Sequence, residues 1–198
     1  MTEPLDVVLL AGSPRQPSYT RGLARAIGGA LEARAVRVHL FDLRAAPLPP
    51  MVPELRAKRS QHPDPEVARL YRLAEEADAY VLASPTYHNS YAGVLKNAVD
   101  YLTVRDFRYR PVGLACHGGR STQAVDHLRQ VVRGVLGVAI PTQVCTRESD
   151  FSGEPDGDGL YQVTDPEILA RIGRFSDELV LFARHLAALR SELAGPER

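Results

Sequence analysis

The sequence carries no net charge. Over its 198 residues, 24 lysines and arginines are matched by 24 aspartates and glutamates. Without an excess of one sign, the chain lacks the broad field that attracts nucleic acid or an anionic membrane surface. We therefore expect its partners to be small molecules or further copies of the same chain.

Cysteine is also scarce, with only Cys116 and Cys145, far apart and each inside an apolar run. Disulfide frameworks and metal sites use short, repeated cysteine spacings. We predict two buried free thiols. The acidic stretch 156–158 imitates a calcium loop only in part, because Leu160 and Tyr161 occupy places that need a ligand and a glycine. No metal site is predicted.

Long hydrophobic runs are missing too. No stretch reaches the roughly 18 uninterrupted apolar residues of a membrane-spanning helix. The first apolar run, residues 5–11, contains Asp6 and follows Glu3 rather than the basic segment of a signal peptide. The run is better interpreted as a first strand, and we expect a cytoplasmic protein.

Short β-branched runs alternate with segments of helical period along the whole chain, and the length suits one domain over residues 1–198. The predicted strands are residues 5–12, 36–43, 80–84, 111–117 and 138–144. The predicted helices are residues 18–32, 64–77, 91–102, 121–136 and 166–193. This alternation favours an α/β fold of three layers, a doubly wound five-stranded parallel sheet of order 2-1-3-4-5, with ligands at the switch point between strands one and three.

Two connections are longer than is usual in such folds. Residues 45–63 carry five prolines, which predict an extended arm without a helix. This arm has two possible interpretations: it is a passive surface loop, or it acts as a lid or a subunit contact. Residues 147–159 are acidic and rich in glycine, and this connection could also be functional.

The turn after the first strand, residues 12–20, gives the strongest functional signal. Ser13, Ser18 and Thr20 surround Arg15 where a helix begins. Free amides at a helix start, together with hydroxyls and a guanidinium, suit a dianionic phosphate. The turn lacks the Gly-Lys-Ser/Thr of a Walker loop and the spaced glycines of a dinucleotide fingerprint. An ordinary helix capped by Ser18 is the competing interpretation.

A second polar cluster follows the third strand, on the other side of the predicted switch point. Pro85 ends sheet pairing, Tyr87 offers a flat ring, and residues 88–90 have free backbone amides. A flavin ring needs such a surface. Simple packing is an equal alternative for Tyr87, and His88 is more often a surface group than a general acid.

A third cluster, residues 117–121, follows the fourth strand and opens another helix. Gly118 and Gly119 would let the backbone approach a ring closely, or would simply form a tight turn. Three loops therefore converge on one predicted crevice.

At these residues the chain resembles the NADPH-dependent FMN reductase family, whose fold is flavodoxin-like. The family's Gly-Ser-x-Arg-x-x-Ser-x-Asn/Thr motif is matched by Gly12, Ser13, Arg15, Ser18 and Thr20, with Tyr19 in the aromatic position. Its Pro-x-Tyr segment and the Gly-x-Leu-Lys-Asn that follows are matched by Pro85, Tyr87, Gly93, Leu95, Lys96 and Asn97, with Asp100 as the later aspartate. The cofactor-binding residues that the resemblance implies are Ser13, Arg15, Ser18, Tyr19, Thr20, Pro85, Thr86, Tyr87, His88, Asn89, Ser90, Gly118, Gly119 and Arg120.

The resemblance implies an enzyme that passes hydride from NADPH or NADH to N5 of FMN and then reduces an acceptor. No side chain is expected to act as an essential acid or base. Ser90-Tyr91 and His117-Gly118-Gly119 look closest to sulfonate-type flavin reductases, which reduce free FMN for a partner monooxygenase. A quinone, azo or chromate reductase with tightly bound FMN is the alternative, and a nonenzymatic electron-transfer flavodoxin or a flavin-free phosphate-binding regulator are rivals of other classes.

In many relatives the site is shared between subunits, so a homodimer or homotetramer is implied. The helix beginning at Tyr91 and the proline arm are the segments we expect at that contact.

Overall fold

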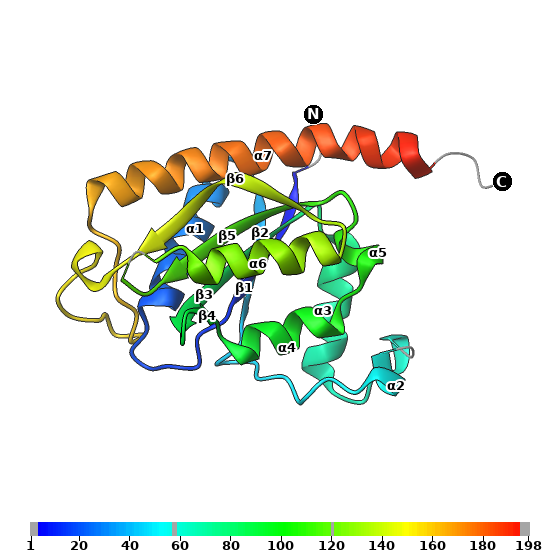
Figure 1. Ribbon diagram of the computed structural model, residues 1–198, viewed down its shortest axis with the longest axis horizontal. Coiled ribbons are helices and arrows are strands. Elements are labelled where there is room, and N and C mark those ends of the chain that lie inside the picture. Colours follow the sequence, from blue (N-terminus) through cyan, green and yellow to red (C-terminus); the bar gives the residue numbers. More distant parts are fainter. Residues whose placement is uncertain (1–3, 57–58, 120, 195–198) are drawn as a thin grey trace.

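A computed structural model describes residues 4–56, 59–119 and 121–194 of the chain. Its centre is one sheet in the order β2-β1-β3-β5-β6, with all neighbours in this path parallel (Figure 1). The strands are β1 (Asp6–Ala11), β2 (Arg37–Asp42), β3 (Ala79–Tyr87), β4 (Ser90–Tyr91), β5 (Pro111–His117) and β6 (Val138–Thr146). The five long strands confirm the predicted order, and the short β4 adds an antiparallel hairpin to the end of β3.

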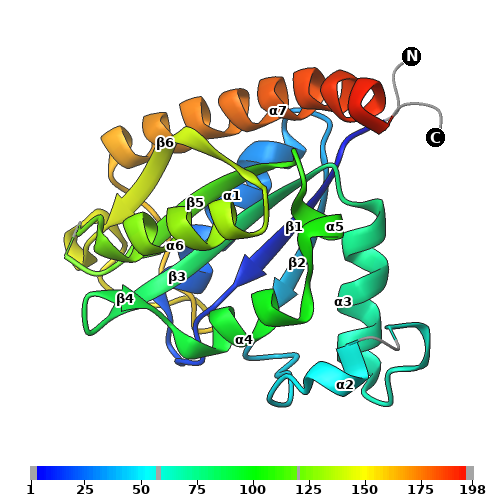
Figure 2. The same cartoon turned by 45° about the vertical axis from the view of Figure 1, so that its right-hand side comes forward.

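Helices cover both faces of this sheet, which confirms the three layers (Figures 1 and 2). The helices are α1 (Tyr19–Glu32), α2 (Pro53–Arg56), α3 (Pro65–Glu76), α4 (Gly93–Tyr101), α5 (Val104–Phe107), α6 (Gln123–Gly134) and α7 (Pro166–Ala194), with 3-10 turns η1 (Arg59–Gln61) and η2 (Glu148–Asp150). One face packs against α1 and α7, and the other packs against α3, α4 and α6. Although α7 is long, no helix among the described residues is both long and apolar enough to cross a membrane.

The central strands are apolar on both sides because both faces of the sheet are covered. In β1, Val8 and Leu10 belong to the core beneath α3, α4 and α6. Val7 and Leu9 point to the opposite core beneath α1 and α7. This double burial explains why β1 is a continuous apolar run rather than an alternating one.

Aspartate side chains cap two of these helices. The Asp64 carboxylate accepts from the Glu66 and Val67 amides at 2.9 and 3.0 Å, and Pro65 opens α3. Asp165 does the same at the start of α7, at 2.8 and 3.1 Å from the Glu167 and Ile168 amides. These carboxylates satisfy amides that have no partner inside the helix.

The predicted helix 91–102 was wrong at its start, because residues 90–91 form β4 and α4 begins at Gly93. The Ser84 hydroxyl accepts from the Ala92 amide at 2.9 Å and holds the chain extended there. The prediction that prolines forbid a helix in the arm was also wrong for α2. Pro53 occupies its first turn, where a missing amide hydrogen costs nothing.

The arm is bound along α4. The Asn97 amide donates to the Pro49 carbonyl at 2.8 Å and accepts from the Met51 amide at 2.9 Å. The Tyr101 hydroxyl also donates to the Pro49 carbonyl, at 3.0 Å. The arm is therefore an ordered part of the surface beside α4.

Both cysteines are free, as predicted. Cys116 is fully buried on β5, but Cys145 is only half-buried. The prediction of two buried thiols fails at Cys145 because β6 is an edge strand, which has a sheet neighbour on one side only.

Candidate functional site

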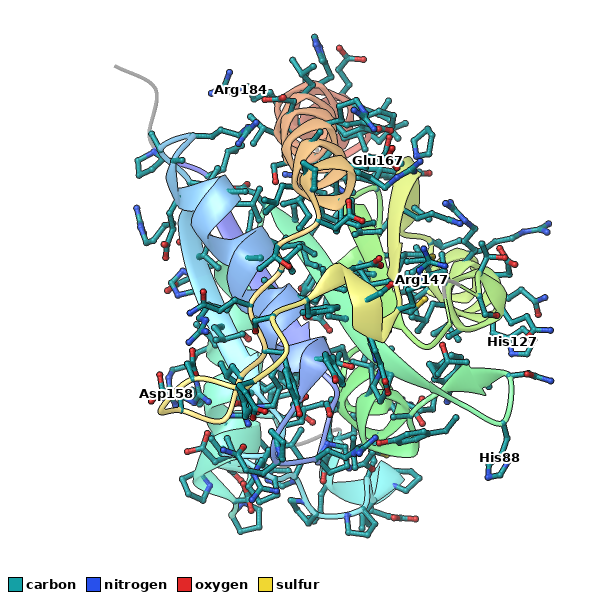
Figure 3. The ribbon with its side chains drawn as sticks, turned by 90° about the vertical axis from the view of Figure 1, so that its left-hand side faces the viewer. His88, His127, Arg147, Asp158, Glu167 and Arg184 are labelled. Carbon is teal, nitrogen blue, oxygen red and sulfur yellow. The ribbon has the colours of Figure 1, made fainter. Side chains whose placement is uncertain are left out.

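The carboxyl ends of β1, β3, β5 and β6 meet at one edge of the sheet, which faces the viewer in Figure 3. The turns that follow β1, β3 and β5 are the three polar clusters that the sequence singled out. Parallel strands place the loops at their carboxyl ends together, which explains why segments about a hundred residues apart form one site.

The turn after β1 depends on a close approach by α4. A Cβ on Gly12 would lie 2.8 Å from Leu95 Cβ, and the Gly12 amide donates to the Ala83 carbonyl at 2.8 Å. A larger residue would push α4 away from β1. Gly12 therefore sets the distance between the first cluster and the second.

Beneath this turn lie two buried serine hydroxyls. Ser18 Oγ donates to Ser13 Oγ at 3.0 Å and accepts from the Arg21 amide at 3.2 Å. Ser18 is thus the N-cap of α1, as the competing interpretation required. Thr20 is buried in the first turn of α1, whereas Arg15 is exposed above the serines. A capped helix and an anion site are compatible here, since the first amides of α1 face the same turn as Arg15.

A cleft of about 490 Å³ adjoins this turn. It is lined by Arg15, Pro85, Thr86, Tyr87, His117, Gly118, Gly119, Arg147, Glu148 and Ser149. The structure therefore brings parts of all three predicted clusters to one cavity. Arg120 lies outside the described residues.

Thr86 of the second cluster and Gly118 of the third cluster are in contact in the lining of the cleft. Gly118 has a φ of +155°, and a Cβ there would lie 2.6 Å from Thr86 Cβ. The Thr86 hydroxyl is buried, and among the described residues only the weak thiol of Cys116 interacts with it. A buried hydroxyl with so poor a partner, inside a cleft, suits a ligand that offers a hydrogen-bonding edge.

The tip of the β3–β4 hairpin lies away from the cleft. Figure 3 shows the His88 side chain pointing outward from the hairpin. His88 and Asn89 are exposed, with left-handed φ of 47° and 63°. The Ser90 hydroxyl lies 3.0 Å from His127 Nδ1 on α6. These three predicted site residues therefore lie outside the cleft lining, while Pro85, Thr86 and Tyr87 belong to it.

Tyr19 has its ring covered on both sides. The ring stacks on His117 at 4.5 Å between centroids and on Tyr161 at 3.8 Å, with Phe151 edge-on at 5.1 Å. Burial raises the pKa of Tyr19, as does its hydrogen bond with the Tyr161 hydroxyl. With both faces occupied, Tyr19 supports the cleft from behind and is not free to stack on a ligand ring.

His117 is held neutral. Burial lowers its pKa and Arg15 acts in the same sense, against the opposite effect of Glu148 and Asp150. The Thr146 hydroxyl donates to the Cys116 carbonyl, so its oxygen accepts from His117 Nδ1 at 3.2 Å. This network assigns the proton to Nδ1 and leaves Nε2 with a free electron pair.

Sequence reasoning missed the residues after β6. Arg147, Glu148 and Ser149 line the cleft, and the Arg147 amide donates to the fully buried Asp150 at 2.9 Å. The only signal was the unusual length of the connection, which suggested that it could be functional without identifying its residues.

Residues 151–161, between η2 and α7, are here named the docking segment, because they bind the turn after β1. The Ser18 amide donates to the Gly159 carbonyl at 3.0 Å, and Gln16 Nε2 donates to the Asp158 carbonyl at 2.7 Å. Arg25 on α1 forms an ion pair with Asp156. Figure 3 shows the segment, labelled at Asp158, beside α1.

Residues 5–150 match the family model described as NADPH-dependent FMN reductase. The chain belongs to this family. A curated relative, the FMN-dependent NADPH-azoreductase of Staphylococcus saprophyticus, is 36% identical over 180 residues, covering 90% of this chain and 95% of the relative. Because it belongs to this family, the protein is an oxidoreductase that uses FMN and NADPH. Membership therefore argues against the two alternatives from other classes, a nonenzymatic flavodoxin and a flavin-free regulator.

Solved structures agree on the fold of this FMN reductase family member. The flavoenzyme FerB, an NAD(P)H:acceptor oxidoreductase from Paracoccus denitrificans, aligns with a TM-score of 0.68 at 22% identity, covering 89% of this chain and 97% of FerB. A flavodoxin from the domain Archaea aligns with a TM-score of 0.60 at 15% identity, covering 90% and 98%. The fold is flavodoxin-like.

The described residues fit FMN. Arg15 and the start of α1 offer positive charge for its phosphate, and the cleft beside them offers the ill-partnered Thr86 hydroxyl for a polar ring edge.

Proposed function

We propose that this chain keeps FMN bound and passes electrons from NADPH to small aromatic acceptors, with azo compounds as the first class to test. The observation that carries the proposal is the cleft itself, whose three walls come from the carboxyl ends of β1, β3 and β5–β6. The azoreductase activity named for the 36% identical relative supports the acceptor class.

The chain's own residues would bind and orient rather than react. Arg15 and the amides at the start of α1 would hold the phosphate, while Pro85–Tyr87 and Gly118–Gly119 would flank the ring. The chemistry that FMN supplies when bound is hydride uptake from NADPH and delivery of electrons to an acceptor. His117 is neutral and has a free electron pair, so it would accept a hydrogen bond rather than donate a proton from Nε2.

The docking segment is an argument that FMN stays bound between turnovers. The bonds from Ser18 to Gly159 and from Gln16 to Asp158 hold the turn after β1 in place before any ligand arrives. A preformed turn loses less conformational entropy on binding, which favours a slowly released cofactor. Our first expectation from sequence, free FMN as the acceptor with a partner monooxygenase, requires instead that FMN exchange at every turnover.

One experiment distinguishes these two functions. Protein loaded with FMN is passed through a gel-filtration column and assayed anaerobically with NADPH and an azo dye, at increasing concentrations of added FMN. Under the proposal, flavin absorbance elutes with the protein and dye reduction does not depend on added FMN. Loss of FMN on the column, with a rate that rises and saturates with added FMN, would support the flavin reductase and refute the proposal.

Arg15→Ala tests the phosphate assignment. Removing a charge-assisted hydrogen bond should weaken FMN binding roughly tenfold to a hundredfold, as measured by flavin fluorescence titration. Arg184→Ala is the matched control, since this exposed arginine on α7 lies far from Arg147 and the cleft edge (Figure 3). Equal FMN affinity in the two variants would refute the assignment of Arg15.

A further inference from the structure

Cys116 and Cys145 are direct neighbours across β5 and β6. They are Cα partners in the parallel register of the two strands, so their side chains leave the same face of the sheet. Neighbouring strands lie about 4.8 Å apart, which is within the range of Cα separations of roughly 4.4 to 6.8 Å that disulfides span. The two thiols, 29 residues apart in sequence, are therefore placed for bond formation without movement of the sheet.

A second cavity gives access to one of these thiols. It has a volume of about 530 Å³, and its lining includes Cys145, Gln143, Thr122 and the α7 residues Arg171 and Arg174. Cys116 does not line it and is fully buried. An oxidant that enters this cavity meets Cys145 first, and Cys116 stands behind it.

The surroundings favour the thiolate at Cys145. The Cys116 thiol lowers the pKa of Cys145 by hydrogen bonding, and Arg171 and Arg129 act in the same sense, while burial and Asp126 oppose them. The pKa of Cys116 is raised by the same hydrogen bond and by burial. The charged groups that act on Cys145 are thus Asp126 and Arg129 from α6 and Arg171 from α7, and Glu167 and Arg174 of α7 line the same cavity. The thiolate is the nucleophilic form of cysteine.

We propose that Cys145 and Cys116 form a peroxide-sensitive pair, in which Cys145 is the reactive thiol and Cys116 the resolving thiol. Cys145 attacks one oxygen of hydrogen peroxide, the O–O bond breaks, and Cys145 becomes a sulfenic acid with release of water. The Cys116 sulfur then attacks the Cys145 sulfur and a second water leaves. In total, two thiols and one hydrogen peroxide give one disulfide and two waters.

Formation of the disulfide would alter the hydrogen bonds of the loop that lines the cleft. When Cys145 is protonated, the Cys116 thiol donates to the Ser121 carbonyl at 3.2 Å, and the Ser121 amide donates to the Gly118 carbonyl at 3.2 Å. A disulfide has no S–H, so it removes the first of these bonds. Because Gly118 lines the cleft, oxidation at the pair is coupled to the loop that follows β5.

The test uses the FMN-loaded protein treated with hydrogen peroxide. Its intact mass should fall by about 2 Da. Trypsin digestion without reductant should give a linked species that joins peptides 109–120 and 134–147, each of which contains one cysteine. Dithiothreitol should restore both peptides. A Cys145 that stays unmodified, or that gains two or three oxygens while Cys116 remains a thiol, would overturn the proposal.

Two variants separate the roles of the thiols. Cys116→Ser should stop at a sulfenic acid on Cys145 that dimedone traps, whereas Cys145→Ser should leave Cys116 unreacted. The reverse pattern would refute the assignment of roles. NADPH turnover of untreated Cys145→Ser should be normal, and peroxide should lower turnover reversibly in the wild type but not in this variant. Disulfide formation with unchanged turnover would refute the coupling to the cleft.

Discussion

Ser18 connects helix stability to ligand binding through a single hydroxyl. The hydroxyl caps α1 through the Arg21 amide and also donates to Ser13 beneath the predicted phosphate site. Sequence patterns identified both possible functions and treated them as alternatives. In the structure they coexist, because the amides that a cap leaves free are the ones available to an anion.

Ser18→Ala should therefore have two effects. Loss of the cap should lower the free energy of unfolding by about 1 kcal/mol, measured by urea denaturation without FMN. FMN affinity should fall as well, because Ser13 loses its partner. Thr122→Ala is the control, since Thr122 is the N-cap residue of α6 but makes no side-chain cap bond, and its hydroxyl donates only to the exposed Asp126 carboxylate, at 2.8 Å. An equal loss of stability in both variants would contradict the role of Ser18.

His117 should make stability depend on pH. Burial lowers the pKa of His117 in the folded protein, so the unfolded chain binds its proton at higher pH than the folded chain does. The stability that neutral His117 contributes is complete above the unfolded pKa of about 6.5 and decreases as pH falls below it.

Urea denaturation between pH 7 and pH 5 would measure this effect. His117→Asn, which cannot titrate, should lose less stability over this range than the wild type does. His127→Asn is the control at an exposed position of α6 and should keep the wild-type dependence. Parallel curves for the wild type and His117→Asn would refute the prediction.

Among single residues, the sequence identified those whose side-chain chemistry, at the end of a strand, indicates a binding site. Arg15, Pro85, Tyr87 and Gly118 follow strand ends and do line the cleft. The ring stack of Tyr161 on Tyr19 could not be predicted, because it depends on how a long loop folds back over α1. The position of His88 after β3 predicts a site residue, but a hairpin turn directs its side chain outward.

At the scale of elements, the long strands and helices could be predicted because their apolar periods reflect burial in two cores. The short elements could not. The two-residue β4 depends on the Ser84 hydroxyl, and α5 depends on the buried Asp106, which accepts from the Thr103 amide at 2.7 Å. Such local hydrogen bonds leave no periodic signal in the sequence.

The docking segment is the element whose contribution can be tested most directly. A Cβ on Gly22 of α1 would lie 1.9 Å from the Tyr161 carbonyl oxygen. Gly22→Ala should therefore force the segment away from α1, lower the free energy of unfolding by about 1–3 kcal/mol and weaken FMN binding.

Gly29→Ala is the matched control on the same helix, where nothing lies within 4 Å of the added carbon. Alanine should stabilise α1 there by about 0.5–1 kcal/mol, because glycine is a poor helix former. Urea denaturation of the two variants should give changes of opposite sign. A stable Gly22→Ala that retains FMN would show that the segment does not support the site.

At the scale of the whole molecule, two pairs of exposed large apolar side chains on different elements are candidates for a contact between copies of the chain. Val52 and Val94 lie on the arm and α4, with 42% and 39% exposed. Leu181 and Leu193 lie on α7, with 53% and 54% exposed. The first pair adjoins a cavity of about 350 Å³, lined by Leu43, Pro47, Leu48, Pro50, Gly93, Val94 and Asn97. In the second pair, Leu193 lines a cavity of about 490 Å³ together with Tyr109 and Arg190.

We expect two copies of the chain to associate through the arm and α4. The family resemblance implies a site shared between subunits, and α4 follows directly from the hairpin that carries Tyr87 of the cleft. Asn97 donates one hydrogen bond to the arm and accepts another from it, so the arm is ordered before association and little further ordering would oppose association. A charge at Val94 would lose its hydration inside such a contact.

Val94→Asp should therefore raise the dissociation constant of the dimer at least about tenfold, measured by light scattering during gel filtration over a dilution series. Leu181→Asp places the same charge on α7 and should leave association unchanged. If Leu181→Asp dissociates the protein and Val94→Asp does not, then α7 forms the contact. In that case the cleft would be complete within one chain, and FMN affinity should not change with protein concentration. Under our prediction, FMN affinity falls on dilution together with the dimer, because the partner copy lies beside the wall formed by Tyr87.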